Sequence, residues 1–341
     1  MTQVSIDGDL AQTATRPRVG FLGVGWIGHH RMRAIAETGQ VEVAAVADPS
    51  AAMIARAAQL APNSKALSML DELFDGDVDG IVIATPTALH AEQSIRALAR
   101  GKAVFCQKPL GRTAAEVRAV IDAARSANRL LAVDLSYRFT EAMDQIRQLV
   151  HNGELGHVYA VELTFHNAYG PDKPWFYEPA LAGGGCVIDL GVHLVDLALW
   201  VLDFPKVVQT SSRLFADGQL LSAPADRAED YALATLDLET GTAVHLTCSW
   251  RLPAGRDAVI SAAFYGTQGG AAMRNINGSF YDFVAELYRG TACECLAAPP
   301  DAWFGRAAAD WAQRLAAGQH FDPSVERCID VAAVLDRIYG R

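Results

Sequence analysis

Three ionisable residues interrupt an otherwise apolar stretch of the chain, GGGCVIDLGVHLVDLALW, at positions 183–200. Asp189, His193 and Asp196 follow one another at intervals of four and three residues, so they share one side of a helix predicted over 187–202. One interpretation is structural: Asp189 caps the helix and His193 is a hydrogen-bonded core residue. The other is that the stripe lines a site in which Asp189 orients His193. An imidazole suits general-base catalysis, which makes His193 the candidate base. Asp196 is assigned a structural hydrogen bond.

A glycine-rich sequence near the start of the chain, Gly23-Val24-Gly25-Trp26-Ile27-Gly28, is typical of a dinucleotide-binding turn. It follows an apolar strand and opens a helix whose N-terminus favours an anion. The three glycines allow, in order, a tight turn, a close approach to a pyrophosphate, and close packing of helix and strand. Asp48 ends the next predicted strand, where a carboxylate binds the adenosine ribose. The next residues, Pro49-Ser50-Ala51, supply no arginine to offset the charge of Asp48 against a 2′-phosphate, so we expect NAD in preference to NADP.

Strands and helices alternate around this turn. Strands are predicted at 19–23, 41–47, 80–85, 102–107 and 130–136. Helices are predicted near 28–38, 50–60, 88–100 and 113–127, and the last opens with the capping box Thr113 to Glu116. This alternation predicts a doubly wound parallel sheet of the Rossmann type, which we assign to residues 18–137.

Consecutive strands replace this alternation after residue 155. Residues 157–167 alternate between apolar and polar, and further strands are predicted at 206–215, 229–239, 242–251 and 258–268. Glu239-Thr-Gly241-Thr and Asn277-Gly278 are hairpin signals. Helices are predicted at 301–317 and from Asp322-Pro323 onward. The pattern predicts a second domain, 138–341, built on an antiparallel sheet. Its last helix is a candidate to pack back on the first domain.

Composition narrows the classes of partner. The 341 residues carry a net charge of −10, which disfavours nucleic acid and anionic membranes as partners. The six cysteines form no C-x-x-C motif, so we expect free thiols in a reducing cytoplasm. No uncharged apolar run reaches transmembrane length, and residues 1–17 lack the features of a secretory signal. We therefore predict a cytoplasmic protein with a flexible leader at 1–17.

Three further motifs resemble the glucose–fructose oxidoreductase / inositol dehydrogenase / rhizopine-catabolism (Gfo/Idh/MocA) family. They are Ala84-Thr-Pro-Thr-Ala-Leu-His90, Gly101-Lys-Ala-Val-Phe-Cys-Gln107-Lys108-Pro109-Leu110, and Gly183-Gly-Gly-Cys-Val-Ile-Asp189-Leu-Gly-Val-His193. The resemblance runs from about residue 18 to the C-terminus. It implies a Rossmann domain followed by an α/β domain with a large, mostly antiparallel open sheet. It also implies a nicotinamide cofactor, a secondary alcohol of a sugar or cyclitol as substrate, and homodimers or homotetramers joined through the open sheet.

The resemblance assigns roles to particular residues. Lys108, Asp189 and His193 are the catalytic candidates. Lys108 lies at the end of a predicted parallel strand, where its ammonium would stabilise a developing alkoxide. His193 would accept the proton, and Asp189 would bind substrate hydroxyls and help hold the imidazole. The residues expected at the cofactor are Gly23, Gly25, Trp26, Ile27, Gly28, Asp48, Thr85, Pro86, His90, Gln107 and Lys108. The chain departs from the family at Gln107, where a glutamate is usual, so a negative charge beside Lys108 is lost.

Two segments are candidates to shape substrate choice. The first spans 166–177, whose aromatic rings would cover the C–H face of a sugar or, alternatively, anchor a loop on the sheet. The second is Tyr137-Arg138, where Arg138 would bind substrate or pair with a structural carboxylate. The predicted substrate contacts are Tyr137, Arg138, His166, Asn167, Lys173 and Trp175.

Several functions are consistent with these residues. The leading one is an NAD-dependent dehydrogenase or reductase for a sugar, cyclitol or sugar derivative. The second is a lyase that oxidises its substrate transiently and returns the hydride, with no net redox change. The third is a non-catalytic dinucleotide-binding regulator, which the intact Lys108, Asp189 and His193 disfavour. A zinc site formed by Asp189, His193 and His166 has only weak support from spacing, so we predict no metal.

Overall fold

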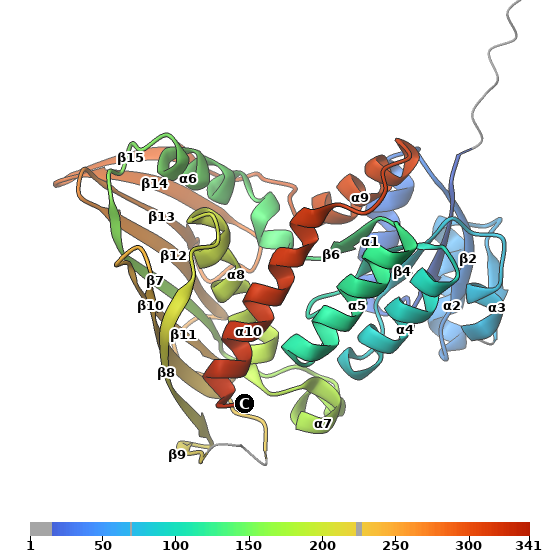
Figure 1. The fold of residues 1–341 in the computed structure, drawn as a ribbon, viewed down its shortest axis with the longest axis horizontal. Coiled ribbons are helices and arrows are strands. Elements are labelled where there is room, and N and C mark those ends of the chain that lie inside the picture. The colour runs from blue at the N-terminus through green and yellow to red at the C-terminus, as the bar shows by residue number, and fades with distance from the viewer. Residues whose placement is uncertain (1–15, 69, 223–226) are drawn as a thin grey trace, which may run out of the picture.

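The computed structural model describes residues 16–68, 70–222 and 227–341, and it contains two β-sheets with helices packed on them (Figure 1). The predicted leader, 1–17, lies outside the described residues except for Arg16 and Pro17. The first sheet is formed by the N-terminal part of the chain and the second by the part that follows residue 157.

The first sheet has six parallel strands in the order β3-β2-β1-β4-β5-β6, which is the order of a doubly wound dinucleotide-binding fold. Its strands are β1 (Arg18–Leu22), β2 (Glu42–Ala47), β3 (Lys65–Leu67), β4 (Gly80–Ile83), β5 (Ala103–Cys106) and β6 (Leu131–Val133). Its helices are α1 (Trp26–Glu37), α2 (Ala51–Leu60), α3 (Leu70–Phe74), α4 (Thr87–Ala99) and α5 (Ala114–Ala127). Every residue of β4 and β5 is buried, as expected for strands covered on both faces. The predicted parallel sheet is confirmed.

The last strand of this sheet is shorter than the predicted strand 130–136. It ends at Val133 because Leu135 N donates to the Val133 carbonyl oxygen (2.7 Å), which closes a tight three-residue turn. A short 3₁₀ helix (Ser136–Phe139) and then α6 (Glu141–His151) follow. The turn directs Asp134 out of the strand, at the carboxyl edge of the sheet.

The second sheet has nine strands in the order β15-β14-β13-β12-β7-β11-β10-β8-β9. They are β7 (Val158–Asn167), β8 (Val207–Ala216), β9 (Gln219–Leu220), β10 (Tyr231–Leu238), β11 (Ala243–Ser249), β12 (Ala258–Gly266), β13 (Gly270–Asn275), β14 (Phe283–Arg289) and β15 (Ala292–Ala297). The neighbours are antiparallel except for β7 and β11, which run parallel at the centre of the sheet. The predicted large, mostly antiparallel sheet is confirmed, and the parallel pair was not predicted.

Helices cover one face of the second sheet, and Figure 1 shows the other face open. The helices of this part are α6, α7 (Pro179–Ala182), α8 (Val192–Val201), α9 (Arg306–Ala316) and α10 (Arg327–Tyr339). Helix α8 packs on β7, β11 and β12, while α10 contacts β8 and α8 and also α5 of the first sheet. Helix α9 packs on α1 and β5, where Trp311 is fully buried. The C-terminal helices therefore join the two sheets.

One segment among the described residues, Pro179–Val201, is long and apolar enough to cross a membrane by length and composition alone. However, 89% of its most apolar window is buried inside the structure, and the segment includes the core helix α8. Its hydropathy is explained by its packing between the sheet and α10.

Candidate active site

The glycine-rich turn has the geometry of a phosphate cradle. Gly23 has a φ of +82°, and a Cβ there would lie 2.6 Å from the Ala84 carbonyl oxygen, so only glycine fits. A Cβ on Gly28 would overlap the Gly23 carbonyl oxygen. A Cβ on Gly25, in contrast, would meet no atom within 4 Å. Open space therefore lies in front of Gly25 at the start of α1, and a pyrophosphate fits this position.

Asp48 lies beside this turn at the end of β2. Its Oδ2 accepts a hydrogen bond from Val24 N and its Oδ1 accepts one from Ser50 N, each at 2.8 Å. The carboxylate therefore fixes the turn and the start of α2 together. It is only partly buried, at the carboxyl edge of the sheet where such folds bind the adenosine ribose.

His90 joins two loops at the same edge. Its Nδ1 lies 2.7 Å from the Pro109 carbonyl oxygen and its Nε2 lies 2.7 Å from that of Thr85. The ring is buried, and burial lowers the pKa of His90. Thr85 Oγ1 donates to Gln93 (2.6 Å), and Pro86 precedes the first residue of α4. The structure therefore places His90 between the loops that follow β4 and β5, where it holds their relative position.

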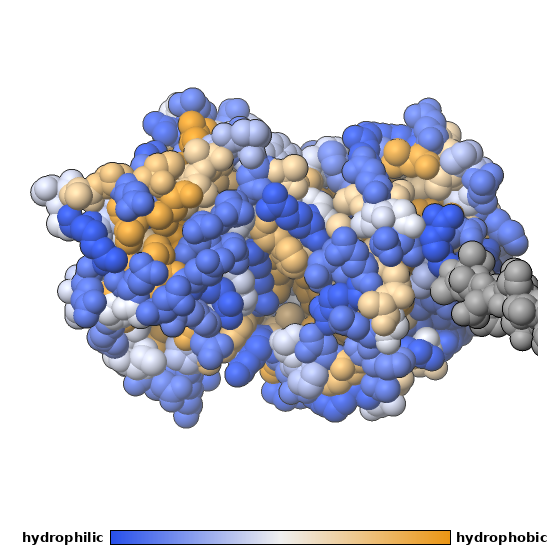
Figure 2. All heavy atoms as spheres, turned by 90° about the horizontal axis from the view of Figure 1, so that it is seen from above, coloured by the Kyte–Doolittle hydropathy of each residue, from blue (hydrophilic) through white to orange (hydrophobic). Residues whose placement is uncertain are grey.

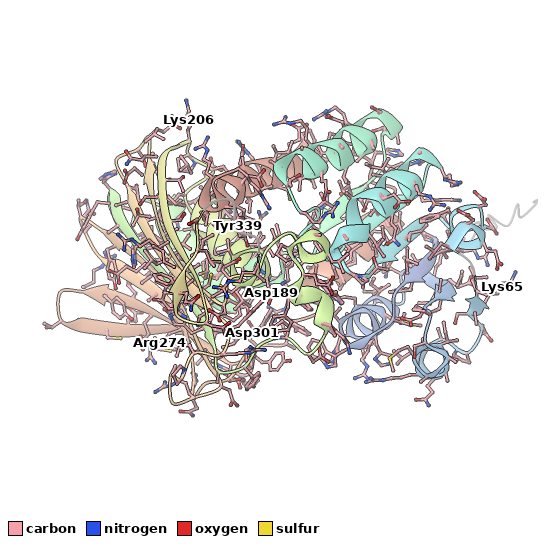
Figure 3. The ribbon with its side chains drawn as sticks, turned by 90° about the horizontal axis from the view of Figure 1, so that it is seen from below. Lys65, Asp189, Lys206, Arg274, Asp301 and Tyr339 are labelled. Atoms are coloured by element: carbon pink, nitrogen blue, oxygen red, sulfur yellow. The ribbon has the colours of Figure 1, made fainter. Side chains whose placement is uncertain are left out.

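Lys108 connects the two sheets. It follows β5, and its Nζ donates to Asp189 Oδ1 (2.8 Å) and to the Asp189 carbonyl oxygen (2.7 Å). Asp189 Oδ2 accepts a third hydrogen bond, from Trp250 Nε1 (3.1 Å). The Lys108 and Asp189 side chains are 19% and 15% exposed, so the ion pair remains accessible. Asp189 lies near the middle of the molecule in Figure 3, and in Figure 2 the surface narrows between the two halves.

His193 lies on the first turn of α8, but Asp189 does not orient it. No hydrogen bond joins these two side chains in the described part of the chain, because Asp189 is bound to Lys108 and Trp250. Residues Val187–Gly191 form a π-helical turn, so the side chains do not follow the spacing of a regular α-helix. The His193 ring instead meets Tyr137 edge-on, with centroids 4.8 Å apart. Burial, and then Lys108 and Arg31, lower the pKa of His193 well below its ordinary value.

Arg138 is held by Asp196 rather than presented to a substrate. Its Nε and Nη2 donate to the two carboxylate oxygens at 2.8 and 2.5 Å, and Asp196 is buried. This pairing is the structural role predicted for Asp196 and one of the two alternatives stated for Arg138. Of the two neighbours Tyr137 and Arg138, only Tyr137 contacts the His193 ring in the described structure. Burial, together with Tyr281 and Asp189, raises the pKa of Tyr137.

His166 lies on the opposite face of the second sheet from α8. Successive side chains of a strand alternate between faces, and Phe165, its neighbour, faces the His193 ring. His166 instead contacts Ser249 Oγ (2.8 Å) and stacks on Tyr231. The His166 ring is therefore directed away from the face of the sheet that carries His193, while its predicted contact with substrate stays a prediction. The described residues contain no group of three His, Cys, Asp or Glu side chains that is placed to hold a metal ion.

The rest of the 166–177 segment reaches the site through Trp250. The rings of Phe176 and Tyr177 pack edge-on against the Trp250 ring, with centroid distances of 6.3 and 5.5 Å. Trp175 stacks on Phe176 with ring centroids 3.8 Å apart. Asn167 follows Phe165 on the inner face, and its Oδ1 is buried without a partner among the described residues. Lys173, in contrast, is 62% exposed and pairs with Asp172, so it points to solvent.

Sequence reasoning missed the side chains that hold the start of the helical segment carrying Asp189 and His193. Glu229 is buried and accepts hydrogen bonds from Gly185 N (2.9 Å), Val187 N (2.8 Å) and the Tyr339 hydroxyl (2.8 Å). The Tyr339 hydroxyl in turn accepts from Ile188 N (3.0 Å). Figure 3 shows Tyr339 and Asp189 in the middle of the molecule. No local signal marks Glu229 or Tyr339, because each lies far along the chain from the helix.

Comparisons with known proteins agree with this geometry. Residues 17–135 match the model of an oxidoreductase family with an NAD-binding Rossmann fold, and residues 143–272 match that of the GFO/IDH/MocA C-terminal domain. The chain is 34% identical over 265 residues to the rhizopine catabolism protein MocA of Rhizobium meliloti, which covers 76% of this chain and 79% of that protein. It is 29% identical over 278 residues to D-glucoside 3-dehydrogenase of Escherichia coli (strain K12), covering 77% and 78%.

Solved structures share the fold. Levoglucosan dehydrogenase in complex with NADH superposes with a TM-score of 0.81 at 20% identity, covering 95% of this chain and 96% of that one. At this level of identity the likeness establishes the arrangement of the two domains.

Proposed function

The chain belongs to the Gfo/Idh/MocA family of oxidoreductases, and on this premise we propose that it transfers a hydride between NAD and a secondary alcohol of a sugar, cyclitol or sugar derivative. One observation carries the proposal. Lys108 follows a strand of the first sheet and binds Asp189, which lies in the helical layer that packs on the second sheet. His193 lies about one turn further along the chain. The names of the relatives, a glucoside dehydrogenase among them, support the substrate class.

The nicotinamide, when bound, supplies the carbon that accepts the hydride. The turn at Gly23–Gly28 and the Asp48 carboxylate would hold the dinucleotide, as the open space at Gly25 allows. Lys108 has three N–H donors and gives two of them to Asp189, so one remains for a substrate oxygen. That donor stabilises the negative charge that develops on the oxygen as the C–H bond breaks.

The hydroxyl proton goes to His193 in this scheme. Because its pKa is lowered, the imidazole is neutral at physiological pH and has a lone pair free to accept a proton. Asp189 keeps its carboxylate fixed between Lys108 and Trp250, so its part is to hold the lysine and to accept hydrogen bonds from substrate hydroxyls.

A panel of glycosides, free sugars, anhydrosugars and cyclitols tests the proposal. We expect NADH to form in a 1:1 ratio with oxidised product for at least one member of the panel. Consumption of a substrate without net NADH would contradict a dehydrogenase and support the lyase reaction with transient oxidation. Neither NADH formation nor substrate consumption across the panel would contradict the substrate class.

Asp48 is the basis of the cofactor preference. Its carboxylate faces the turn without a neighbouring arginine, so a 2′-phosphate would be repelled. We expect tighter binding of NADH than of NADPH in fluorescence titrations, and a narrowed or reversed preference for Asp48→Ser. Equal affinity of the unmodified protein for both cofactors would contradict this assignment.

The compartment and the assembly are part of the same proposal. All six cysteines are free thiols, which is consistent with a reducing cytoplasm. The uncovered face of the second sheet is a surface through which two or four copies would associate.

A further inference from the structure

A buried hydrogen-bond network lies behind Lys108 and has no part in the scheme above. Asp134 follows β6, and its side chain is fully buried. Its Oδ2 accepts hydrogen bonds from Arg31 Nε (2.5 Å) and from Gln107 Nε2. Arg31 also donates to the Phe304 carbonyl oxygen and lies over the Phe304 ring, at 4.2 Å from its centroid. One anion and one cation are therefore buried together, with the Gln107 amide as their neutral partner.

The chemistry of the donors fixes which way Gln107 faces. An arginine only donates and an ionised carboxylate only accepts, so the amide nitrogen of Gln107 must face Asp134. Its oxygen, Oε1, is then directed away from Asp134, and no described residue donates to it. The backbone at this position is held too, because Gln107 N donates to the Ile83 carbonyl oxygen (2.9 Å). The side chain and the backbone of the residue before Lys108 are thus both anchored.

A glutamate at position 107 would not fit this network. When ionised it has no donor, so two carboxylates would compete for one arginine inside the protein. In this chain the residue before Lys108 is neutral, and the negative charge lies on Asp134 across from it.

We propose that Asp134 and Arg31 are positioning residues for the Gln107-Lys108 turn, and that the identities of residues 107 and 134 are coupled. The carboxylate at 134 requires an amide donor at 107, and together they hold Gln107 Oε1 and the start of the Lys108 side chain toward the cofactor edge. The inference rests on the proposed function only for the role of this edge in binding the cofactor. The coupling itself is a property of the protein without cofactor.

A double-mutant cycle tests the coupling. Gln107→Glu places two carboxylates together, and Asp134→Asn leaves Arg31 buried without an anion. The variant with both changes moves the negative charge from position 134 to position 107. Its amide at 134 can donate to the carboxylate at 107, and that carboxylate is then the anion for Arg31.

We expect each single change to lower the melting temperature of the cofactor-free protein and to weaken NADH binding on the order of 10-fold. The double variant is expected to recover NADH binding to within about threefold of the unmodified protein.

A matched control separates this network from a general effect of adding a carboxylate. The half-buried Gln145 also donates its amide to a carboxylate, that of Glu141, in a hydrogen bond exposed to solvent (2.9 Å). Because solvent screens that pair, Gln145→Glu should change NADH affinity by less than about twofold. If Gln107→Glu does not fold, Gln107→Met removes the donor without adding a charge. It should still bind NADH less tightly than the unmodified protein.

The outcomes are distinguishable. An unchanged melting temperature and an unchanged NADH affinity in Gln107→Glu would overturn the proposal. So would a double variant whose losses of melting temperature and NADH affinity equal the combined losses of the two single variants. Rescue of melting in a protein that never binds NADH would uphold the network and contradict the proposed cofactor. NADH affinity that stays native in every variant while melting falls would assign the network to stability alone.

Discussion

The proposed chemistry depends on the amine of Lys108, which reaches from the first sheet to Asp189. Lys108→Ala removes the donor that would meet the substrate oxygen and leaves Trp250 as the one hydrogen-bond donor to the Asp189 carboxylate among the described residues. We expect kcat to fall about 100-fold or more, the range typical for loss of one electrostatic donor, with the fold retained by circular dichroism. Lys65→Ala, at an exposed position on β3, is the matched control. Turnover close to that of the control would assign Lys108 to structure.

His193 is the residue whose protonation should control the pH profile. Its folded-state pKa is lowered below 6.5, so the imidazole is neutral near pH 7, and the oxidation rate should fall only as the pH drops below about 6.5. His193→Asn should reduce kcat by roughly 10²–10⁴-fold and remove this acid limb, while NADH affinity changes little. The measurement is kcat/KM against pH for both proteins. An acid limb that is unchanged in the variant would contradict the assignment of His193 as base.

The lowered pKa of His193 also predicts how the free energy of unfolding changes with pH. Between the lowered folded-state pKa and about 6.5, the unfolded chain binds more protons at this histidine than the folded protein does. The free energy of unfolding should therefore decrease as the pH falls through this window, and this contribution should be absent from His193→Asn. The measurement is urea unfolding against pH, with His151→Asn at an exposed position as the matched substitution.

At the scale of secondary-structure elements, a residue from the last helix holds the start of the helical segment that carries Asp189 and His193. Tyr339 of α10 bonds both Ile188 N and the buried Glu229, and a Cβ on Gly184 would overlap its hydroxyl. The π-helical turn that carries Asp189 is thus held from behind by α10. This explains why small residues precede the turn, and why a C-terminal helix contributes to a site formed mainly by earlier elements.

Tyr339→Phe removes those two hydrogen bonds without changing the shape of the ring. We expect kcat to fall about tenfold, because Asp189 and Lys108 lose their fixed position, and stability to fall by about 1–3 kcal/mol. NADH affinity should change by less than about threefold, since the glycine-rich turn is untouched. Tyr159→Phe, at an exposed position on β7, is the control. A variant with lowered stability but native kcat would limit Tyr339 to folding.

At the scale of the whole molecule, the second sheet is covered on one side only. Its open face carries Ser211, Thr235, His245 and Glu162 in a row across adjacent strands, and Ser211 bonds Thr235 across β8 and β10 (2.7 Å). This row is polar and exposed, and it lies on the face opposite to α8. A contact there would leave the cofactor and substrate sites of every copy accessible.

We expect light scattering to give the mass of two or four chains. Thr235→Arg, at the centre of the open face, should shift the protein toward a single chain, because a bulky charge would be buried at the contact. NADH affinity should not change. Gln145→Arg on the exposed side of α6 is the control and should leave the mass unaltered. A single-chain mass for the unmodified protein, or an unaltered mass in Thr235→Arg, would contradict association through this face.

The sequence alone determined the glycine-rich turn, the two kinds of sheet and most of their elements, although β3, α3, α6 and β13 to β15 were not predicted. These features are encoded locally. Strands and helices follow from the period of apolar residues, and the turn follows from three glycines whose roles are fixed by their own backbone and nearest neighbours. The parallel pair β7–β11 was not predicted, because a pairing within a sheet depends on the path of the intervening chain.

Only the tertiary structure decided which side chains are partners. Asp189 was expected to orient His193, four residues away, but it binds Lys108 and Trp250, which are 81 and 61 residues distant. His166 was placed near the substrate by its sequence neighbours, yet the alternation of its strand directs it to the opposite face. Arg31 and Asp134 are 103 residues apart, and Glu229 and Tyr339 are 110 apart. A charged or hydrogen-bonding group is satisfied by whatever the packed elements bring within about 3 Å of it, and no spacing along the chain records that distance.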